Sequence, residues 1–301
     1  MAKSSRDQSA RPAQPGPAPR PEPTAMADPV PSLSLIDGRP MPQLGFGAYQ
    51  VEEARAPAVV GAAIRAGYRS IDTAAIYGNE AGIGRAIRDA DVARADLFIT
   101  TKLWNDRHGY DAAQVALDES LARLGLDHVD LYLIHWPCPG QGRFVEAWKG
   151  LIALRASGKA RAIGVSNFTP AHLDRIIGET GVVPAVNQVE LHPRFQQAAL
   201  RAAHIRHGIV TESWSPLGRG QGLADPVLVA IAKAHGRTSA QVVLRWHIQS
   251  GLVAIPKTAT LERISENIAV FDFTLSADEM ARIAALDRVD GRTGPDPDRF
   301  G

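Results

Sequence analysis

The sequence has little cysteine, no excess of charge of either sign and no long apolar segment. Its 301 residues include one cysteine, Cys138, which excludes an intrachain disulfide and a zinc site built from several cysteines. Lys and Arg number 33 and Asp and Glu 32, so the basic excess typical of a nucleic-acid binder is missing. No apolar run approaches the roughly 18–20 residues that span a bilayer. We therefore expect a cytoplasmic protein that acts on small molecules, with no nucleic-acid or membrane partner.

The first 31 residues differ in composition from the rest of the chain. They contain eight of the 21 prolines and almost no large apolar side chains. Such a segment cannot bury enough surface to offset the entropy lost on ordering. We therefore predict a disordered Pro/Ala-rich tail over residues 1–31 and a single folded domain over residues 32–301, with Met26 as an alternative start.

From about Pro31 onward, short β-rich apolar runs alternate with amphipathic stretches. In the stretches 111–124, 145–156 and 226–235, apolar residues recur at spacings of three and four, which predicts helices. Two more helical stretches, Ala240–Gln249 and Asp278–Leu286, add to the simple alternation. The predicted strands are Gln43–Gly47, Tyr68–Asp72, Leu97–Lys102, Asp130–His135, Ala160–Ser166, Ala185–Glu190, Gly208–Trp214 and Leu252–Pro256.

Eight strands that alternate with helices favour a (β/α)8 TIM barrel. A doubly wound sheet is the competing α/β fold, and its glycine-rich fingerprint G-x-G-x-x-G is missing after the first strand. The glycines at 45 and 47 form too short a motif, and those at 82 and 84 lie inside a helical stretch. We therefore predict an α/β protein: a (β/α)8 barrel with two extra helices.

Polar side chains stand where several predicted strands end, the place where barrel enzymes carry their chemistry. Asp72, Lys102 and His135 end strands, and Tyr77 follows Asp72 by five residues. A buried lysine paired with Asp72 would place an ammonium near the phenol and lower the phenol pKa, which is ordinarily about 10. Tyr77 would then be a general acid, with His135 orienting a substrate oxygen. This set suits protonation of a carbonyl oxygen while hydride from a nicotinamide attacks the carbon.

Two other enzyme classes can be weighed against this interpretation. A barrel glycosidase could use paired carboxylates from Asp72, Glu190 and Glu212, but it would leave the lysine unexplained. A Tyr-x-x-x-Lys dehydrogenase is excluded by spacing, because Tyr77 and Lys102 are 25 positions apart.

We expect no metal site. His204 and His207 have the spacing of a metal-binding pair on a helix, but no third ligand is evident, which favours a polar helix face. Cys138 has no neighbouring base in the sequence and is assigned no role.

Several long motifs, in order, resemble the aldo-keto reductase family. They are Asp72–Glu80 (DTAAIYGNE), Leu131–Pro137 (LYLIHWP), Gly164–Phe168 (GVSNF), and Ile255–Thr258 (IPKT) with Arg263, Glu266 and Asn267 after it. The resemblance runs from about Ser32 to Gly294. Within the family, Thr101–His108 and Glu212–Gly218 are most similar to the bacterial 2,5-diketo-D-gluconate reductases.

The resemblance implies a barrel that binds NADPH without a Rossmann domain. It implies Tyr77 as proton donor, Lys102 and Asp72 as the pair that tunes it, and His135 as the group that orients the carbonyl. The implied cofactor residues are Ser166, Asn167, Gln188 and Trp214 at the nicotinamide, Ser215, Pro216, Leu217 and Gly218 at the pyrophosphate, Lys257, Thr258 and Arg263 at the 2′-phosphate, and Glu266 and Asn267 at the adenine. The implied substrate residues are Tyr49, Trp104, His135 and Trp136.

The expected activity is the NADPH-dependent reduction of a small keto sugar, keto acid or aldehyde to the alcohol, by a monomer. The alternative is a non-catalytic NADPH-binding sensor or subunit on the same barrel. Glu266 could instead form a salt bridge with Arg263, three residues away. The chain after Val289 is short, which predicts that the large substrate loop of the mammalian members is missing.

Overall fold

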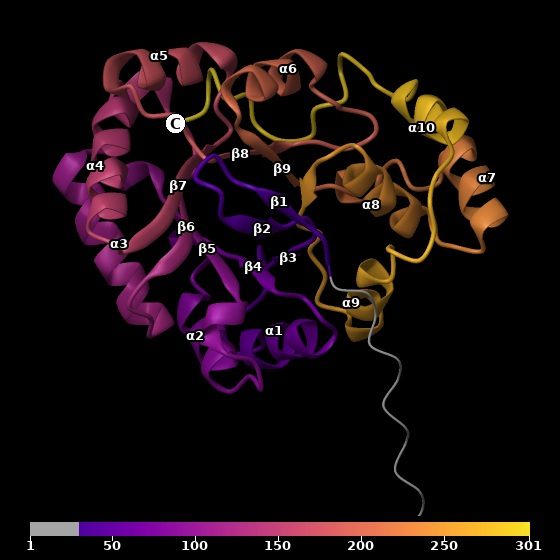
Figure 1. Cartoon of the computed structure of the whole chain (residues 1–301), viewed down its shortest axis with the longest axis horizontal. Helices are drawn as coiled ribbons and strands as arrows, with labels where there is room; N and C mark the ends of the chain where they lie inside the picture. The colour runs from indigo at the N-terminus through magenta and orange to yellow at the C-terminus, as the bar shows by residue number, and fades with distance from the viewer. Residues whose placement is uncertain (1–29) are drawn as a thin grey trace, which may run out of the picture.

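The computed structural model describes residues 30–301, so all but the last two residues of the predicted tail lie outside the described residues. The first elements are the short strands β1 (Ser32–Ser34) and β2 (Pro40–Pro42), which pair antiparallel as a hairpin. Sequence analysis did not predict this hairpin. Met41 of β2 is fully buried among the inward-facing apolar side chains of the barrel strands. The hairpin therefore closes one end of the barrel (Figure 1).

The central sheet is parallel, and its strand order follows the chain from the first strand to the last. The bridge between Leu44 and Ala254 brings its two edges together and closes the barrel. The strands are β3 (Phe46–Gly47), β4 (Ser70–Asp72), β5 (Phe98–Leu103), β6 (Val129–Ile134), β7 (Ala160–Ser166), β8 (Val186–Glu190), β9 (Val210–Trp214) and β10 (Val253–Ala254). Each observed strand lies within or next to the segment predicted for it.

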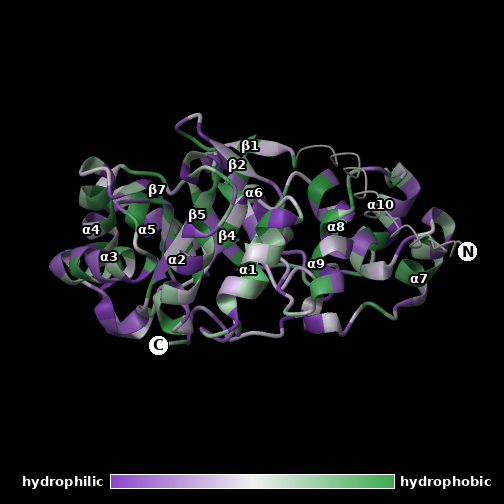
Figure 2. Cartoon of the chain, turned by 90° about the horizontal axis from the view of Figure 1, so that it is seen from below, coloured by the Kyte–Doolittle hydropathy of each residue, from purple (hydrophilic) through white to green (hydrophobic). Residues whose placement is uncertain are grey.

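Helices surround the sheet and cover its outer face (Figure 1). The helices are α1 (Ala56–Arg65), α2 (Glu80–Arg88), α3 (Tyr110–Leu124), α4 (Phe144–Ala156), α5 (Pro170–Thr180), α6 (Ala198–His207), α7 (Pro226–His235), α8 (Ser239–Gln249), α9 (Leu261–Ile268) and α10 (Ala277–Ala284). In Figure 2 they carry hydrophilic and hydrophobic stretches together, as expected of helices with one face on a sheet. Within residues 30–301, the parallel sheet and ten helices confirm the predicted (β/α)8 barrel with two additional helices.

The identity of one additional helix differs from the prediction. Two helices, α7 and α8, separate β9 from β10, and α8 is the one that packs against β10. The outer helix α7 packs against α8 and α10 instead. The extra helices are therefore α7 and α10, whereas the sequence assigned Ala240–Gln249, most of α8, as extra.

Local sequence signals set where several helices begin and end. Thr169 caps α5 in a reciprocal capping box with His172, and Pro170 takes the first helical position, where its missing N–H costs nothing. Gly236 ends α7 in the left-handed region at φ 61°. Among residues 30–301, no helix combines the length and apolarity needed to cross a membrane.

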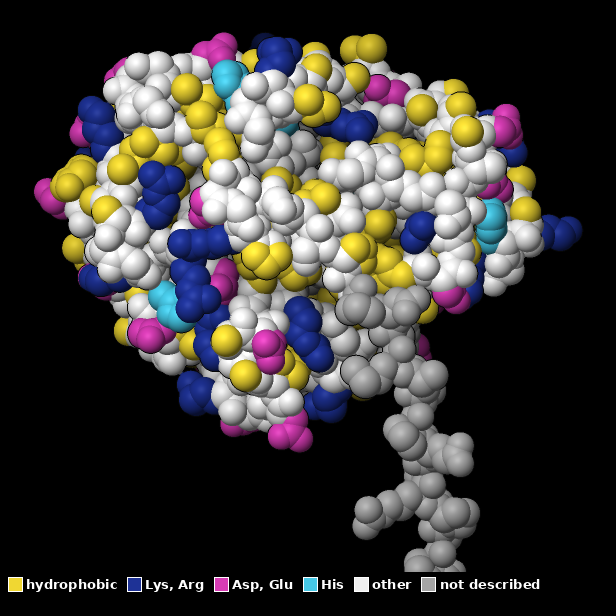
Figure 3. Space-filling model, in the orientation of Figure 1, with side chains coloured by type: hydrophobic (Ala, Val, Ile, Leu, Met, Phe, Trp, Pro, Cys, Tyr) yellow, Lys and Arg dark blue, Asp and Glu magenta, His cyan; other side chains and the backbone are white. Residues whose placement is uncertain are grey.

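The two ends of the barrel carry different segments. Figure 2 shows the β1–β2 hairpin at one end and the C-terminus of the chain at the other. The hairpin face is shown in Figure 3, where basic side chains gather left of centre with acidic ones among them. Among the described residues, Arg94 and Arg161 both form ion pairs with Asp130.

Candidate active site

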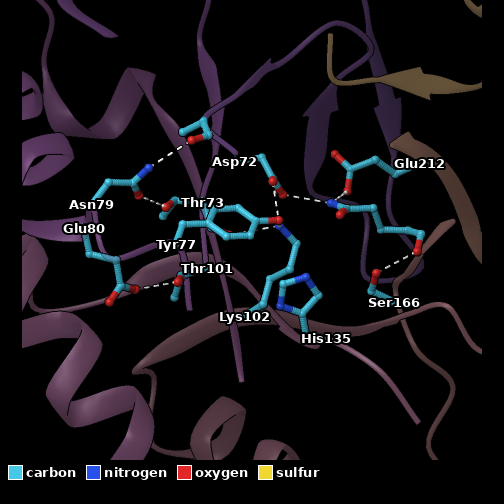
Figure 4. Close-up of polar contacts among 12 residues, drawn as sticks. Asp72, Thr73, Tyr77, Asn79, Glu80, Thr101, Lys102, His135, Ser166 and Glu212 are labelled. Carbon is cyan, nitrogen blue, oxygen red and sulfur yellow. Dashed lines mark hydrogen bonds and ion pairs between the residues drawn. The ribbon is translucent and has the colours of Figure 1, made fainter. Parts of the chain in front are cut away.

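Four predicted residues meet at the carboxyl ends of neighbouring strands (Figure 4). Asp72 ends β4, Lys102 lies near the end of β5 and His135 directly follows β6. Tyr77 lies on the 3-10 turn η1 (Ala75–Tyr77) that follows β4. The Lys102 Nζ lies 2.6 Å from Asp72 Oδ1 and 3.5 Å from Tyr77 Oη, and the Tyr77 and His135 rings are 5.7 Å apart. The structure therefore brings all four side chains into one site.

Lys102 is fully buried, yet its surroundings favour the charged form. Burial lowers the pKa of Lys102, but the Asp72 carboxylate and then Tyr77 raise it, and the balance lies above the ordinary lysine value. The ammonium also donates to the Thr73 carbonyl oxygen at 2.9 Å. Lys102 is therefore an ammonium at neutral pH and is held in place by two acceptors.

The pKa of the Tyr77 phenol shifts in the opposite direction from the prediction. Burial raises the pKa of Tyr77, and this effect outweighs the lowering by Lys102. The expectation of a net lowering was therefore wrong, because it weighed the ammonium without the full cost of removing a phenolate from water. The ring stays partly exposed, while the hydroxyl points toward Lys102 and Asp72 (Figure 4). Tyr77 thus keeps its proton through the neutral range and is a phenol rather than a phenolate.

His135 is a neutral imidazole at physiological pH. Burial, followed by the nearby Lys102 charge, holds the pKa of His135 well below its usual value. Its Nδ1 is buried and has no hydrogen-bond partner among residues 30–301. The ring packs edge-on against Trp104 with 5.1 Å between centroids. A neutral ring can still donate one N–H hydrogen bond to a substrate oxygen.

Asn79 and Glu80 hold the Tyr77 turn in place, a role that sequence analysis missed. Asn79 donates to the Ala48 and Val51 carbonyl oxygens at 2.9 Å each and accepts from Thr73 Oγ1 at 2.7 Å. Glu80 accepts from Thr101 Oγ1 at 2.6 Å, beside Lys102 on β5, and is salt-bridged by Arg123. These contacts join the turn to β5 and to the loop after β3. The only sequence signal was their place in the motif Asp72–Glu80.

The residues predicted to contact the nicotinamide lie together at the ends of β7, β8 and β9. Asn167 donates to the His135 carbonyl oxygen at 2.9 Å and to Ser166 Oγ at 3.0 Å. Its Oδ1 accepts from the Trp214 indole N–H at 2.8 Å. Ser166 Oγ donates to the backbone oxygen of Gln188 at 2.8 Å. Three of these side chains and the backbone oxygen of Gln188 thus form one connected group, and the roles of the four residues toward a cofactor stay predictions.

Gln188 joins this group to a second buried carboxyl. Its Nε2 lies 2.8 Å from Asp72 Oδ2 and 2.8 Å from Glu212 Oε2. Glu212 is fully buried, and burial followed by the Asp72 charge raises the pKa of Glu212 to about 8. Sequence analysis considered Glu212 as a glycosidase carboxylate and missed this contact, because it depends on strand register.

Glu190, the other carboxylate of the glycosidase alternative, has a different task. Its carboxylate accepts from Thr293 N and Oγ1 at 2.7 and 2.6 Å and from Gly294 N at 2.9 Å. Glu190 therefore binds the C-terminal segment to the barrel, and it is not free to act on a glycosidic bond.

The residues predicted to bind the 2′-phosphate lie after β10. Lys257 and Arg263 are exposed and make no ion pair with any residue of the described part. Arg263 lies in the first turn of α9, where the helix dipole favours an anion. An exposed cation in the first turn of a helix, with a second exposed cation shortly before the helix in the chain, suits a phosphate. Thr258 Oγ1 is not free of contacts, since it accepts from Thr260 N at 3.1 Å.

The residues predicted to bind the adenine lie in α9, and those predicted to bind the pyrophosphate follow β9 in the chain. Glu266 accepts a hydrogen bond from Thr238 at 2.7 Å and does not pair with Arg263, and Asn267 is buried beside it. The chain from Ser215 to Gly218 leads into the 3-10 turn η5 (Gly218–Gly220). Ser215 has φ 47° and Gly218 φ 56°, a sharply turned backbone.

Aromatic rings lie around the site, and their role toward a substrate stays a prediction. Tyr49 lies 5.1 Å from Tyr77, and Trp136 lies 6.5 Å from Trp214. Phe300 packs on Trp136 at 4.6 Å, which places the C-terminal segment at the same wall. Sequence analysis missed Phe300, and an aromatic residue in a short polar terminus was its only signal.

The parallel barrel and a tyrosine hydroxyl beside a buried lysine, at the carboxyl ends of its strands, are together typical of a barrel oxidoreductase. The chain belongs to the aldo-keto reductase family, since the sequence model of the Aldo/keto reductase family matches residues 43–288. It is thus an oxidoreductase of that family.

Individual relatives are similar over nearly the whole chain. The methylglyoxal reductase DkgA of Escherichia coli (strain K12) is 51% identical over 278 residues, which cover 92% of this chain and all of DkgA. The structure of a Gox0644 mutant in complex with NADPH is 50% identical, with a TM-score of 0.87 over 90% of this chain and 98% of that one. A putative 2,5-diketo-D-gluconic acid reductase B is 39% identical, with a TM-score of 0.85 over 88% and 94% of the two chains. The predicted resemblance to bacterial reductases of this type is confirmed.

Proposed function

We propose that this protein reduces small aldehydes, keto acids or keto sugars to alcohols with NADPH, and that Tyr77 donates the proton. The observation that carries the proposal is the Tyr77 hydroxyl, 3.5 Å from a buried Lys102 that Asp72 holds at 2.6 Å. The name of the relative DkgA, a methylglyoxal reductase, supports a small carbonyl substrate.

Each of the four residues has its own part in the protonation of a carbonyl oxygen: His135, Tyr77, Lys102 and Asp72. Neutral His135 donates a hydrogen bond to that oxygen and orients the carbonyl over Tyr77. Tyr77 transfers its phenol proton as negative charge develops on the oxygen. An alkoxide is a far stronger base than a phenolate, so a phenol with a raised pKa still gives up its proton. Lys102 stabilises the phenolate left behind, and Asp72 keeps Lys102 charged and in position.

The cofactor residues would hold an extended NADPH across the ends of the strands. When bound, it would supply the hydride for the carbonyl carbon. Gln188, Asn167 and Ser166 would fix its carboxamide, and Trp214 would stack on the ring. The exposed cations after β10 would hold the 2′-phosphate, and the Gox0644 complex with NADPH supports this choice of cofactor.

The substrate pocket would be walled by Tyr49, Trp104 and Trp136, with Phe300 added by the structure. A pocket lined by flat apolar rings, with polar groups on one side only, suits small carbonyl compounds. We propose that the protein is cytoplasmic. We also propose a monomer, because one chain supplies every residue of the site as described.

A substrate panel tests the proposal. Oxidation of NADPH is followed by absorbance with methylglyoxal, keto sugars, keto acids and aromatic aldehydes. We expect turnover with at least one class. Tight NADPH binding without turnover of any member would favour the non-catalytic sensor instead.

The cofactor preference is tested by Arg263→Ala. We expect this variant to weaken NADPH binding by about tenfold or more and NADH binding little, because only NADPH carries the 2′-phosphate. Titration of both cofactors by fluorescence measures the two losses. Equal losses would show that the phosphate lies elsewhere.

A further inference from the structure

Glu212 is a carboxyl group inside the barrel that the proposed proton transfer does not use. It lies in the middle of β9, where its partners in register are Gln188 on β8 and Val253 on β10. It is fully buried, and its Oε1 has no hydrogen-bond partner among the described residues. A buried carboxyl is costly, so its position beside the site calls for a physical reason.

The contacts of Glu212 determine which way the Gln188 amide faces. Gln188 Nε2 donates to Asp72 Oδ2 and to Glu212 Oε2, so both hydrogens of its amide group are used. Asp72 is itself fixed by Lys102 at 2.6 Å. Figure 4 shows Asp72 and Glu212 facing each other across these hydrogen bonds. A flipped amide would turn its oxygen toward the Asp72 carboxylate, which has no proton to donate, so the two acceptors hold Oε1 on the opposite side.

We propose that Glu212 is a positioning residue that locks the Gln188 amide with its carbonyl oxygen toward the nicotinamide carboxamide. This inference rests on the proposed function, in which Gln188 contacts that carboxamide. The carboxamide N–H₂ would donate to Gln188 Oε1, and this contact would set the ring orientation from which hydride leaves. Asp72 alone offers one acceptor and leaves the second hydrogen of the amide unpaired.

The protonation state of Glu212 agrees with this role. With its pKa raised to about 8, the carboxyl is mostly neutral at pH 7. A neutral carboxyl can accept from Gln188 without placing a second anion beside Asp72.

A cofactor analogue tests the inference through binding. In the 3-acetylpyridine analogue of NADP⁺, a methyl ketone replaces the carboxamide, so the ring substituent can no longer donate to Gln188. Dissociation constants of NADP⁺ and the analogue are measured by tryptophan fluorescence or calorimetry for each variant. We expect the wild type to prefer NADP⁺ by about tenfold, the scale of one lost hydrogen bond in a buried site.

The variants separate positioning from packing. E212M keeps the side-chain length without a carboxyl oxygen, and we expect it to lose most of the preference; E212A serves in its place should E212M not fold. Q188A loses the preference as well, and the double variant E212M/Q188A shows no further loss. E212Q keeps an acceptor oxygen, so we expect it to keep the wild-type preference for NADP⁺. Ser213→Ala, the neighbouring buried position on β9, is the matched control and leaves the preference unchanged.

The outcomes distinguish this inference from the proposed function. A folded E212M with the wild-type preference, or a wild type that binds both cofactors equally, overturns the positioning role and leaves carbonyl reduction intact. A wild type that does not bind NADP⁺ overturns the proposed function itself, together with the inference.

Discussion

The Tyr77 phenol has an acidity that depends on opposing effects within one site. Removal from water raises its pKa, Lys102 lowers it, and Asp72 raises it again. The same lysine lowers the pKa of His135. One buried ammonium therefore adds to the effect of burial in keeping the imidazole neutral, and it can stabilise a phenolate as the proton leaves.

Replacement of Tyr77 by phenylalanine removes the proton donor and little else. We expect Tyr77→Phe to lower kcat by about 10²- to 10⁴-fold, the usual contribution of a general acid. The dissociation constant of NADPH should change by less than about threefold, since the proposed cofactor contacts lie on other residues. Stopped-flow kinetics and a fluorescence titration measure the two quantities.

Tyr110 provides the control for this variant. It is an exposed tyrosine at the start of α3, and Tyr110→Phe should leave kcat unchanged. A Tyr77→Phe enzyme with normal turnover would remove the phenol from the mechanism.

Glu212 should make stability depend on pH. Its folded-state pKa is raised from 4.5 to about 8, so the folded state holds this proton more tightly than the unfolded chain. The stabilisation that this proton gives the folded state is fully present below about pH 4.5 and is lost as pH rises through about 8. Relative to Glu212→Gln, which cannot ionise, the wild type should lose a few kcal/mol of unfolding free energy between pH 5 and pH 9.

Urea unfolding of both proteins at pH 5, 7 and 9 measures this difference. The gap between them should widen with rising pH and level off above about pH 8. A gap that stays constant would mean that Glu212 is ionised throughout this range.

At the scale of elements, helix α2 is positioned by close backbone contact as well as by apolar packing. An added Cβ at Gly84 in α2 would lie 2.1 Å from the Leu124 carbonyl oxygen at the end of α3. The first residue of α2 is Glu80, which holds the Tyr77 turn against β5. The packing of α2 therefore contributes to the position of Tyr77, the proposed proton donor.

Two helical glycines make a matched pair that tests this contact. We expect Gly84→Ala to destabilise the protein by about 2 kcal/mol or more, because backbone must move to admit the methyl group. Gly178 lies within α5, with nothing within 4 Å of an added Cβ, so Gly178→Ala should stabilise by roughly 0.5–1 kcal/mol. Thermal or urea unfolding measures both. Similar effects from the two substitutions would contradict the close packing of α2 on α3.

At the scale of the whole molecule, the C-terminal segment joins distant parts of the barrel. It follows α10, binds Glu190 through Thr293 and Gly294, and ends with Phe300 on Trp136. The segment therefore reaches the proposed substrate pocket.

Phe300 should therefore affect substrate recognition more than chemistry. We expect Phe300→Ala to raise KM for aromatic aldehydes by about three- to tenfold, with a smaller rise for methylglyoxal and little change in kcat, because one aromatic contact is worth about 1 kcal/mol. Steady-state kinetics with both substrates measures this. Val289→Ala, at a fully exposed position of the same segment, is the control. An equal rise in KM for both substrates would place Phe300 outside the apolar wall.

Much of the architecture could be predicted from the sequence, and each missed or wrong prediction has a physical cause. The barrel strands were predictable because buried parallel strands form continuous apolar runs. The β1–β2 hairpin was missed because its strands are three residues long and β2 contains two prolines, which read as loop. The extra helix was misassigned because α7 and α8 are both amphipathic, and only packing shows that α8 contacts β10.

The amino-acid sequence alone determined the alternation of strands and helices, the family and the four side chains of the proposed proton-transfer site, because each is encoded in a contiguous motif or a local period. The tertiary structure alone decided the net direction of the Tyr77 pKa, the pairing of Glu212 with Gln188 and the place of Phe300. The physical reason is that acidity and hydrogen bonding depend on burial and on distances between residues far apart in the chain. No local pattern of residues encodes those distances.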